Sequence, residues 1–419
     1  MPRLIHRFDA LSVLTLWMVS LYIFPSEATI SAVQSLGRPS TILGLACLLW
    51  WVLHTTLRSR PEARPHQPVR IAVVVFVLVV LVSYAVTNAR GMPVTDRSVA
   101  DSALIRLASW VGPALVVMDG VRRKDEFFVL LRRIGVAGTA MATLGLIQFV
   151  TGRTWIDIIQ LPGFTTAGSD LGGRGGFFRP VGTASHALEY AIVISAAFPL
   201  TLNAALFLHR SGLLRRWYGS VIIALASLFA VSRSALIGVV TGLLVLAPTW
   251  PPRVRAKTAL VGICLLGAVY LTVPGIIGTL RGMFSLSGDT STDSRVDSWD
   301  TAFEIAGRYP GVGRGFGTFI GSYRILDNAY LVMLIEVGIV GVIAYFAMIL
   351  TALYCVFTAA HRTNDPVLRN QLQALGAALT AVALLAAFFD AFSFNQAVAT
   401  TFLLIGCCGA ARQVQTDTG

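Results

Sequence analysis

The residues best suited to chemistry in this sequence are arginines that stand apart from its basic clusters. Arg233 is the clearest case, because it lies in the short segment Ser232-Arg233-Ser234 between two apolar runs. Guanidinium groups bind phosphate through paired hydrogen bonds and do not lose their charge. Charged residues at the edge of the hydrocarbon are usually paired or functional. We therefore expect Arg233 to bind an anionic ligand; an ion pair with Glu189 or Asp390 is the structural alternative.

Two long polar segments carry further arginines of this kind. Residues 275–327 interrupt an otherwise apolar chain, and residues 151–186 form a second segment rich in glycine, aromatic and charged residues. Connections of this length are usually functional or disordered, and this composition is not that of a linker. We expect both segments to fold and to share one site. Their arginines are Arg153, Arg174, Arg179, Arg281, Arg295, Arg308, Arg314 and Arg324.

The elements that position these residues are membrane-spanning helices. The chain has 419 residues, of which 55% are apolar and only 13% charged, with a mean hydropathy of +0.72. This composition excludes a soluble globular protein. We predict an all-α polytopic membrane protein, a single integral-membrane domain over residues 1–419 with about 12 transmembrane helices, because about 20 apolar residues cross the hydrocarbon. The predicted spans are 9–25, 40–56, 70–88, 101–119, 127–150, 187–208, 217–231, 234–249, 257–274, 329–358, 371–391 and 394–410.

Basic residues predict the orientation of these spans. Clusters such as Arg122-Arg123-Lys124 fall between alternate spans, and short basic loops stay in the cytoplasm. Both termini are then cytoplasmic, the first span is expected to remain uncleaved, and the segments 151–186 and 275–327 are extracytoplasmic. The net charge of +12 becomes mainly a topology signal, which argues against nucleic acid as a partner.

Cysteine and histidine do not predict a metal site. All five cysteines lie in apolar segments, where they are small buried residues, and only His186 among the six histidines maps to the outer side. No cluster has zinc-ligand spacing. We expect chemistry without a metal or another cofactor.

A short interfacial helix is predicted at the start of the first polar segment. Trp155, Ile158 and Ile159 recur at helical spacing after Gly152. Tryptophan is favoured at the membrane interface, so this helix should lie in the interface plane.

An amphipathic surface helix is predicted in the second polar segment, where it would act as a lid. Its apolar stripe runs from Val296 through Trp299 and Phe303 to Ala306, and it ends at Pro310. The following run, residues 311–317, is glycine-rich and could present backbone N–H groups to an anion. A dinucleotide fingerprint is the alternative interpretation, and it fails because no strand precedes the run.

Six short motifs follow one another between residues 140 and 345. They are Gly145-Leu-Ile-Gln148-Phe-Val-Thr-Gly152; Arg179-Pro-Val-Gly182 running to Leu188 and Tyr190; Ser232-Arg233-Ser234-Ala235; Asp293-Ser294-Arg295 with Trp299; Pro310-Gly-Val-Gly313-Arg-Gly315; and Asp327-Asn328-Ala329-Tyr330-Leu331 with Glu336 and Gly338. Their order and spacing, with a long outer loop before the tenth span, resemble the bacterial O-antigen ligase and O-antigen polymerase superfamily. The first five spans match it only in hydrophobic pattern.

The resemblance implies a membrane glycosyltransferase of the bacterial cytoplasmic membrane. Such an enzyme transfers a glycan from an undecaprenyl or decaprenyl diphosphate carrier to the hydroxyl of a glycan, lipid or protein acceptor at the outer face. By motif position, Arg179, Arg233 and Arg295 would clamp the diphosphate and stabilise it as it leaves, so that no divalent metal is needed. A single displacement at the anomeric carbon suffices, which makes the enzyme inverting.

The base that takes the acceptor proton is the point where the chain departs from the family. Ligases of this family typically carry a histidine immediately before the Asn that opens the tenth span, and this chain has Asp327 there. With an ordinary pKa of about 3.9, Asp327 either accepts the proton, or orients the acceptor or pairs with an arginine. Glu336 would face the opposite side of a continuous helix and is expected to be a structural partner. His186 is the alternative base, or else a polar residue at the outer end of a span.

The remaining expected substrate contacts are Arg174, Arg314, Asn328 and Tyr330, together with His186 and Arg179. The apolar run from residue 329 to 360 would be about 48 Å long as a helix, which exceeds the thickness of the bilayer. It either projects beyond the outer surface or breaks near Gly338 and Gly341. Both arrangements place Asp327 at the roof of a cavity.

Two other functions remain open at this point. A polysaccharide polymerase, which uses a second lipid-linked glycan as acceptor, shares the same motifs. A transporter or flippase for lipid-linked sugars would need two similar halves, and the sequence shows no such repeat. A purely structural membrane protein would not need outward arginines in three motifs.

Overall fold

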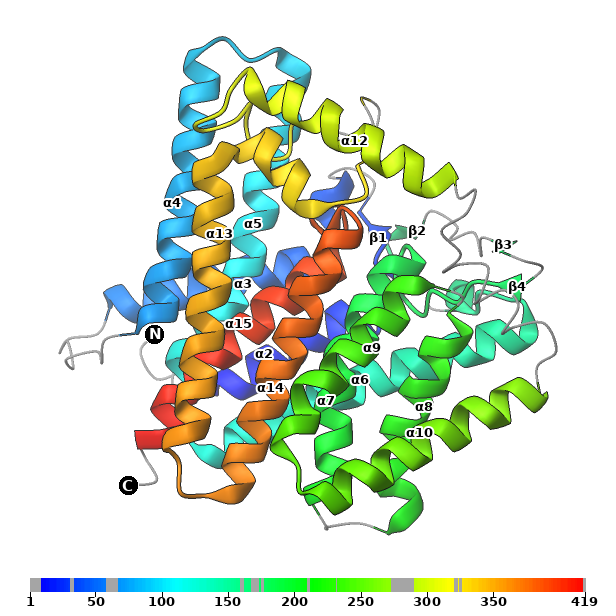
Figure 1. The fold of residues 1–419 in the computed structure, drawn as a ribbon. Coiled ribbons are helices and arrows are strands. Elements are labelled where there is room, and N and C mark those ends of the chain that lie inside the picture. Colours follow the sequence, from blue (N-terminus) through cyan, green and yellow to red (C-terminus); the bar gives the residue numbers. More distant parts are fainter. Residues whose placement is uncertain are drawn as a thin grey trace.

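The computed structural model describes residues 9–30, 34–57, 67–158, 162–166, 173–174, 177–208, 212–230, 232–272, 290–319, 323 and 326–416. The helices of the protein form one bundle, and α12 (Thr290–Gly307) lies across one end of it (Figure 1). Part of the predicted lid, residues 273–289, lies outside the described residues.

Each of the twelve predicted spans coincides with a helix of the bundle. These helices are α2 (Ala10–Tyr22), α3 (Pro39–Thr56), α4 (Pro68–Ala89), α5 (Val94–Gly120), α6 (Lys124–Thr151), α7 (Ala187–Phe207), α8 (Leu213–Phe229), α9 (Arg233–Leu246), α10 (Pro252–Thr272), α13 (Ala329–Arg362), α14 (Pro366–Leu385) and α15 (Asn395–Thr416). In the described part of the chain, 8 helices, α3 to α7 and α13 to α15, are long and apolar enough to cross a membrane. The protein is thus a helical multi-pass membrane protein, as predicted. The count of twelve spans is not confirmed, since α2 and α9 are apolar but shorter, and α8 and α10 are not among the eight.

Burial separates central from peripheral helices. The apolar window of α15 is 89% buried, whereas that of α4 is only 28% buried and exposes large aliphatic side chains such as Leu78 and Val82. Exposed aliphatic faces on long apolar helices are what a lipid environment favours. Small residues allow a close approach of α3 to α5: a Cβ on Gly44 would lie 2.2 Å from the main-chain oxygen of Ser109.

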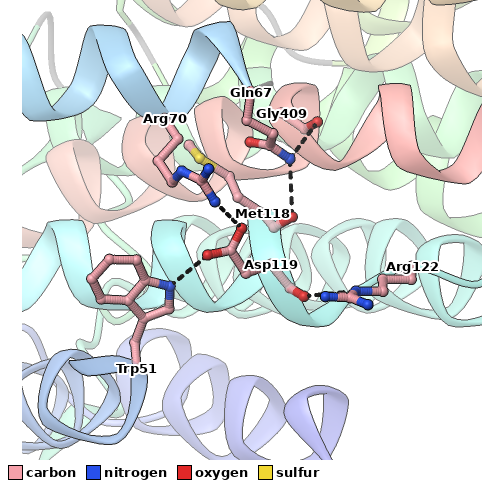
Figure 2. A network of polar contacts seen from close by, with 7 residues as sticks. All are labelled: Trp51, Gln67, Arg70, Met118, Asp119, Arg122 and Gly409. Carbon is pink, nitrogen blue, oxygen red and sulfur yellow. Dashed lines mark hydrogen bonds and ion pairs between the residues drawn. The ribbon is translucent and has the colours of Figure 1, made fainter. Parts of the chain in front are cut away.

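A network around Asp119 fastens one end of the bundle (Figure 2). Its carboxylate accepts hydrogen bonds from Arg70 Nη1 at 2.7 Å and from the Trp51 indole nitrogen at 2.8 Å. The side-chain amide of Gln67 donates to the main-chain oxygen of Gly409 at 3.3 Å. These contacts join α3, α4, α5 and α15, so the ends of four helices meet here.

The same end, which we call the basic end, also holds both limits of the described chain. Ala10, the first residue of α2, lies beside Gly120 at the end of α5, and Gly409 lies near the end of α15. Lys124 forms an ion pair with Asp365 where α6 and α14 begin. Consecutive helices alternate in direction. The helices on either side of residues 152–186 therefore meet this connection at the opposite end of the bundle, and α13 also begins there. We call this other end the loop end.

Short elements at the loop end tie distant connections together. Strand β1 (Ala28–Thr29) pairs antiparallel with β2 (Thr165–Thr166), and β3 (Gly173–Arg174) pairs with β4 (Phe177–Phe178). The 3-10 helix η1 (Gln34–Gly37) precedes α3. Two further turns, η4 (Ala386–Phe388) and η5 (Ala391–Ser393), connect α14 to α15, and η3 (Ala247–Thr249) follows α9. The helix predicted after Gly152 is a single 3-10 turn, η2 (Ile156–Ile158).

A helix, α12, is present where the amphipathic helix was predicted, but its buried face differs from the prediction. Trp299 and Phe303 are exposed, whereas Ala302 and Ala306 are buried. The alanines bring the helix close to an apolar cluster formed by Phe319, Leu326, Leu331, Val332 and Ile335. Small side chains, and not the large aromatic ones, therefore make the contact with the start of α13.

Candidate functional site

Gln148 holds the segment that carries Arg179. Its side-chain amide donates to the main-chain oxygens of Thr154 at 2.6 Å and Gly182 at 2.9 Å. Its side-chain oxygen accepts from the amides of Val181 at 3.0 Å and Gly182 at 2.8 Å. The last turn of α6 thereby fixes both ends of the loop, and it does so with a residue of the first motif.

The glycines of the first two motifs make room for Tyr190. A Cβ on Gly145 would lie 2.2 Å from the Tyr190 hydroxyl, and one on Gly182 would lie 3.1 Å from its ring. Gly182 also has a φ of +60°, which favours glycine. The spacing of these motifs therefore reflects the packing of α6 against α7 beneath Arg179.

Glu189 joins three connections at the loop end. Its carboxylate accepts from the amide and hydroxyl of Ser185, both at 2.8 Å, from the hydroxyl of Ser26 at 3.1 Å and from the amide of Gln396 at 2.6 Å. The loop before α7, the connection between α2 and α3, and the start of α15 thus converge on one buried carboxylate. These bonds give Glu189 a positioning role.

His186 caps α7 and lies next to two other predicted site residues. Its Nδ1 accepts the amide hydrogen of Leu188 at 3.2 Å, and its ring stacks on Phe394 with 5.5 Å between centroids. Burial, and then the charge of Arg179, hold the pKa of His186 below its ordinary value, against the opposing charges of Glu189 and Asp327. Because Nδ1 accepts the cap hydrogen, this geometry favours the tautomer that carries its hydrogen on Nε2.

Asp327 lies exposed at the entrance to α13. The neighbouring Asn328 caps the helix, because its side-chain oxygen accepts the amides of Tyr330 at 2.9 Å and Leu331 at 3.3 Å. The amide of Ala329 donates to the main-chain oxygen of Phe389 at 3.0 Å. The turn that carries Asp327 is therefore held from both sides while its carboxylate stays accessible.

The apolar run after Asp327 breaks at Gly338. A break near this glycine was one of the two predicted alternatives, the other being a helix that projects beyond the outer surface. Gly338 has φ +70° and ψ −173°, a conformation open essentially only to glycine. The carbonyls of Ile335 and Glu336 accept the amides of Arg314 at 3.0 Å and Gly315 at 2.8 Å. In return, the amides of the two residues after Gly338 donate to the main-chain oxygens of Pro310 and Gly311. The glycine-rich loop replaces two consecutive hydrogen bonds of the helix.

This pairing corrects the expectation that the loop offers its N–H groups to an anion. The amide of Gly313 donates to the Tyr309 oxygen at 3.0 Å, and those of the next two residues donate to α13. Glu336, expected as a structural partner, is buried beside the break and accepts the amide of Phe319 at 3.0 Å. Ser83 of α4 donates to the main-chain oxygen of the same glutamate at 3.2 Å.

Two predicted substrate contacts have partners within the protein. Arg314 forms an ion pair with Asp96 at 3.1 Å and lies over the Tyr323 ring, 4.8 Å from its centroid. Tyr330 donates its hydroxyl to the main-chain oxygen of Ala383 at 2.5 Å. Arg314 thereby connects the segment after α12 to the start of α5.

Arg233 lies at the loop end, at the first residue of α9. Gly238 of α9 packs against Ser195 of α7, and Gly242 packs against Pro199, so the two helices run in parallel. At 1.5 Å per residue, Arg233 is level with the first turn of α7, just below His186. For Arg174 and Arg295 the structure describes only the backbone, which lies in β3 and α12, respectively.

The structure adds two arginines that the sequence reasoning did not single out. Arg38 immediately precedes α3 and is within electrostatic reach of Glu27 and Glu189. Arg106, in the upper half of α5, is within reach of Arg38 and of two further carboxyls, Glu336 and Asp390. Burial raises the pKa of both Glu27 and Asp390 above the ordinary range. The sequence signal that could have identified Arg106 is its isolated charge inside an apolar helix.

At the loop end, the charges of Arg179 and Asp327 both reach His186, and Glu189 acts on both His186 and Arg38. Among the residues that the structure describes, no three His, Cys, Asp or Glu side chains form a metal-ligand set. Cations beside a neutral imidazole and an accessible carboxylate suit binding of an anion next to a proton acceptor.

Comparison with known proteins identifies the central part of the chain. A family model described as O-antigen ligase matches residues 218–346, from α8 to the upper part of α13. The matched segment includes Arg233, Arg295 and Asp327, whereas Arg179 and His186 precede it. A comparison with curated proteins found no match. The match over residues 218–346 supports the resemblance of the motifs to the O-antigen ligase superfamily.

Proposed function

We propose that the protein transfers a glycan from a polyprenyl diphosphate carrier to an acceptor hydroxyl. The observation that carries the proposal is that the charges of Arg179 and Asp327 both reach His186 at the loop end. There α13 begins, inside the family-matched segment. A diphosphate carries several negative charges, and a buried or partly buried guanidinium binds them more strongly than one in water.

The proposed step is one inverting displacement. The acceptor oxygen forms a bond to the anomeric carbon, and the bond from that carbon to the diphosphate oxygen breaks. Asp327 takes the acceptor proton, and the polyprenyl diphosphate departs with its added charge held by Arg179, Arg233 and Arg295. The arginines act electrostatically, so the step requires no divalent metal.

His186 and Asn328 support this arrangement in different ways. The imidazole offers its Nε2 hydrogen beside Arg179, where it can donate to a phosphate or sugar oxygen. Asn328 caps α13 and so fixes the position of the adjacent Asp327. Arg174 is proposed as a further contact to the glycan, and so is the ring of Tyr330, whose hydroxyl is bonded to the main-chain oxygen of Ala383.

The proposed orientation places the loop end outside the cytoplasmic membrane. The basic end carries Arg70, Lys124 and Arg362 on different helices, and such residues are retained in the cytoplasm. Both termini are then cytoplasmic, and the donor reaches the site from the outer leaflet with its diphosphate at the membrane surface.

Glycan transfer in vitro tests the proposal. The full-length protein in lipid nanodiscs would receive a synthetic polyprenyl diphosphate glycan and an acceptor glycolipid, in the presence of EDTA. We expect transfer by the wild type and a loss of about 100-fold or more in Arg233→Ala and Asp327→Ala. Arg308→Ala is the matched control, because Arg308 is exposed just after α12 and its ion pair among the described residues is with Glu304, four positions earlier.

Full activity in both site variants would contradict the assignment of these residues. Strict dependence on an added divalent cation would contradict the metal-independent mechanism. Replacing the acceptor by a second lipid-linked glycan distinguishes a polymerase, which elongates it, from a ligase, which does not.

A further inference from the structure

Arg38 and Arg106 occupy neighbouring positions on two helices that pack in parallel. Gly44 of α3 lies against Ser109 of α5, and Gly112 lies against the amide of Leu48 one turn further on. Arg38 stands six residues before Gly44, and Arg106 three residues before Ser109. The two backbone positions therefore differ in height by about 4.5 Å, which the length of an arginine side chain easily spans.

A polar floor, formed by hydrogen bonds between side chains and backbone, lies below Arg106. Trp110, one turn further along the same face of α5, donates its indole hydrogen to the side-chain oxygen of Asn395 at 2.9 Å. The amide of Asn395 donates to the Ser40 hydroxyl at 2.9 Å, and Trp17 donates to the Ser40 main-chain oxygen at 3.1 Å. The face that carries Arg106 is thus turned towards the start of α15 and the turn that holds Asp390.

Several nitrogen and oxygen atoms above this floor have no hydrogen-bond partner. In the described part of the protein, these are Nε and Nη1 of Arg38, Nε of Arg106 and Oδ1 of Asp390, all of them buried. Buried polar groups normally have partners, and leaving a charged one without any is costly. Donors from two guanidinium groups beside one carboxylate oxygen match a ligand that has both an oxyanion and a hydroxyl group.

The nearby carboxylates do not take up these donors. Glu189 accepts hydrogen bonds from Ser185, Ser26 and Gln396, and Glu336 accepts one from Phe319. Asp390 accepts the Ser393 hydroxyl on its other oxygen. Two like charges within reach of each other, with acids already engaged elsewhere, favour an anion from outside the protein.

We propose that Arg38 and Arg106 form a second oxyanion site, which binds a phosphate or carboxylate group of the lipid-linked substrate while Asp390 accepts a sugar hydroxyl. The site rests on the proposed function and lies beside the transfer site, because Glu189 acts on both Arg38 and His186. The stacked ring of Phe394 and the adjacent Asn395 connect the two. Arg38 and Arg106 would then select which substrates bind and would position them relative to the transfer site.

Binding measurements with the full-length protein in nanodiscs test this site apart from catalysis. Three probes would be titrated: sugar-free polyprenyl diphosphate, a neutral lipid-linked disaccharide, and the same disaccharide with a uronic acid. Arg38→Gln and Arg106→Gln should each weaken at least one probe about tenfold or more, whereas Arg97→Gln, on the exposed first turns of α5, should not. Loss for the sugar-free probe assigns the site to phosphate; loss confined to the acidic glycan assigns it to carboxylate.

Unchanged affinity of both variants for all three probes would overturn the second site. If either glutamine variant does not fold, Arg38→Lys and Arg106→Lys replace it, because lysine keeps the charge and removes the paired donors. The proposed function fails separately: wild-type protein would then transfer no glycan, whereas a change in binding by the variants would still support the site.

Discussion

The amide of Gly315 donates a hydrogen bond to the main-chain oxygen of Glu336, 2.8 Å away, where α13 breaks. In an unbroken helix that oxygen would accept the amide four residues later, which here donates to Gly311. The loop after α12 therefore forms part of the hydrogen-bonding pattern of α13, so that the position of α12 and the entrance to α13 depend on one another.

Gly338→Ala should destabilise this junction by about 2–3 kcal/mol, because alanine is strained at φ +70°. Its Cβ would also lie 2.3 Å from the main-chain oxygen of Gly311. Thermal unfolding in detergent measures the effect. Gly311→Ala is the matched control, since a Cβ there meets nothing within 4 Å; equal melting temperatures of the two variants would contradict the account.

Gln148→Leu should cost about 2–4 kcal/mol and reduce transfer, because the buried amides of Val181 and Gly182 lose their acceptor. The loop that carries Arg179 would then no longer be held in place. Gln373→Leu makes the same change at a half-buried position of α14 and should be nearly neutral. Wild-type stability and transfer in Gln148→Leu would show that the loop is fixed by other contacts.

His186 should make stability depend on pH. Its pKa in the folded protein lies below the ordinary value of about 6.5, so its contribution is complete above that pH and is lost as the pH falls towards the folded pKa. The loss is at most about 1.4 kcal/mol per pH unit for one group. His186→Asn should keep the helix cap and flatten this dependence in unfolding curves between pH 7 and about pH 5. An unchanged slope would place the titrating group elsewhere.

The sequence predicted the helices well because each needs only a local run of apolar residues. It could not predict the partners of the loop residues, since these come from distant parts of the chain. Arg314 finds Asp96 on α5, and the glycine-rich loop finds the broken α13. Arg314 and the glycine-rich loop both looked available for substrate when only their neighbours in sequence were known.

The site was predictable to the extent that its residues fall in ordered motifs. Arg179 and Asp327, each singled out by its motif, both act electrostatically on His186, and their role as site residues stays a prediction. Arg38 gave no signal because it stands in a short connection between two spans, and Arg106 was hidden inside a span. Their shared position depends on the close approach of α3 and α5 at Gly44, which no periodicity reveals.

The ion pair of Arg314 with Asp96 should help to hold the segment after α12 against α5. Both side chains are largely buried, with 22% and 13% of their area exposed. A double-mutant cycle with Asp96→Asn and Arg314→Gln should give a coupling energy of about 1–2 kcal/mol in thermal or chemical unfolding. Additive effects of the two changes would show that the pair contributes nothing beyond its separate members.

Asp327→His should retain transfer and change its dependence on pH, because histidine is the residue that ligases of this family typically carry there. A histidine base works only above its own pKa of about 6.5, so the rate should fall on the acid side of that value. Asp327→Asn, which keeps the shape of the side chain but removes the base, should lose about 100-fold or more. Asp327 is exposed, so neither change should alter the melting temperature by much. Initial transfer rates would be measured from pH 5 to 9 with a fixed donor. Asp300→Asn, at an exposed position of α12, is the control. A profile identical to that of the wild type in Asp327→His, or full activity in Asp327→Asn, would show that the acceptor proton goes to another group.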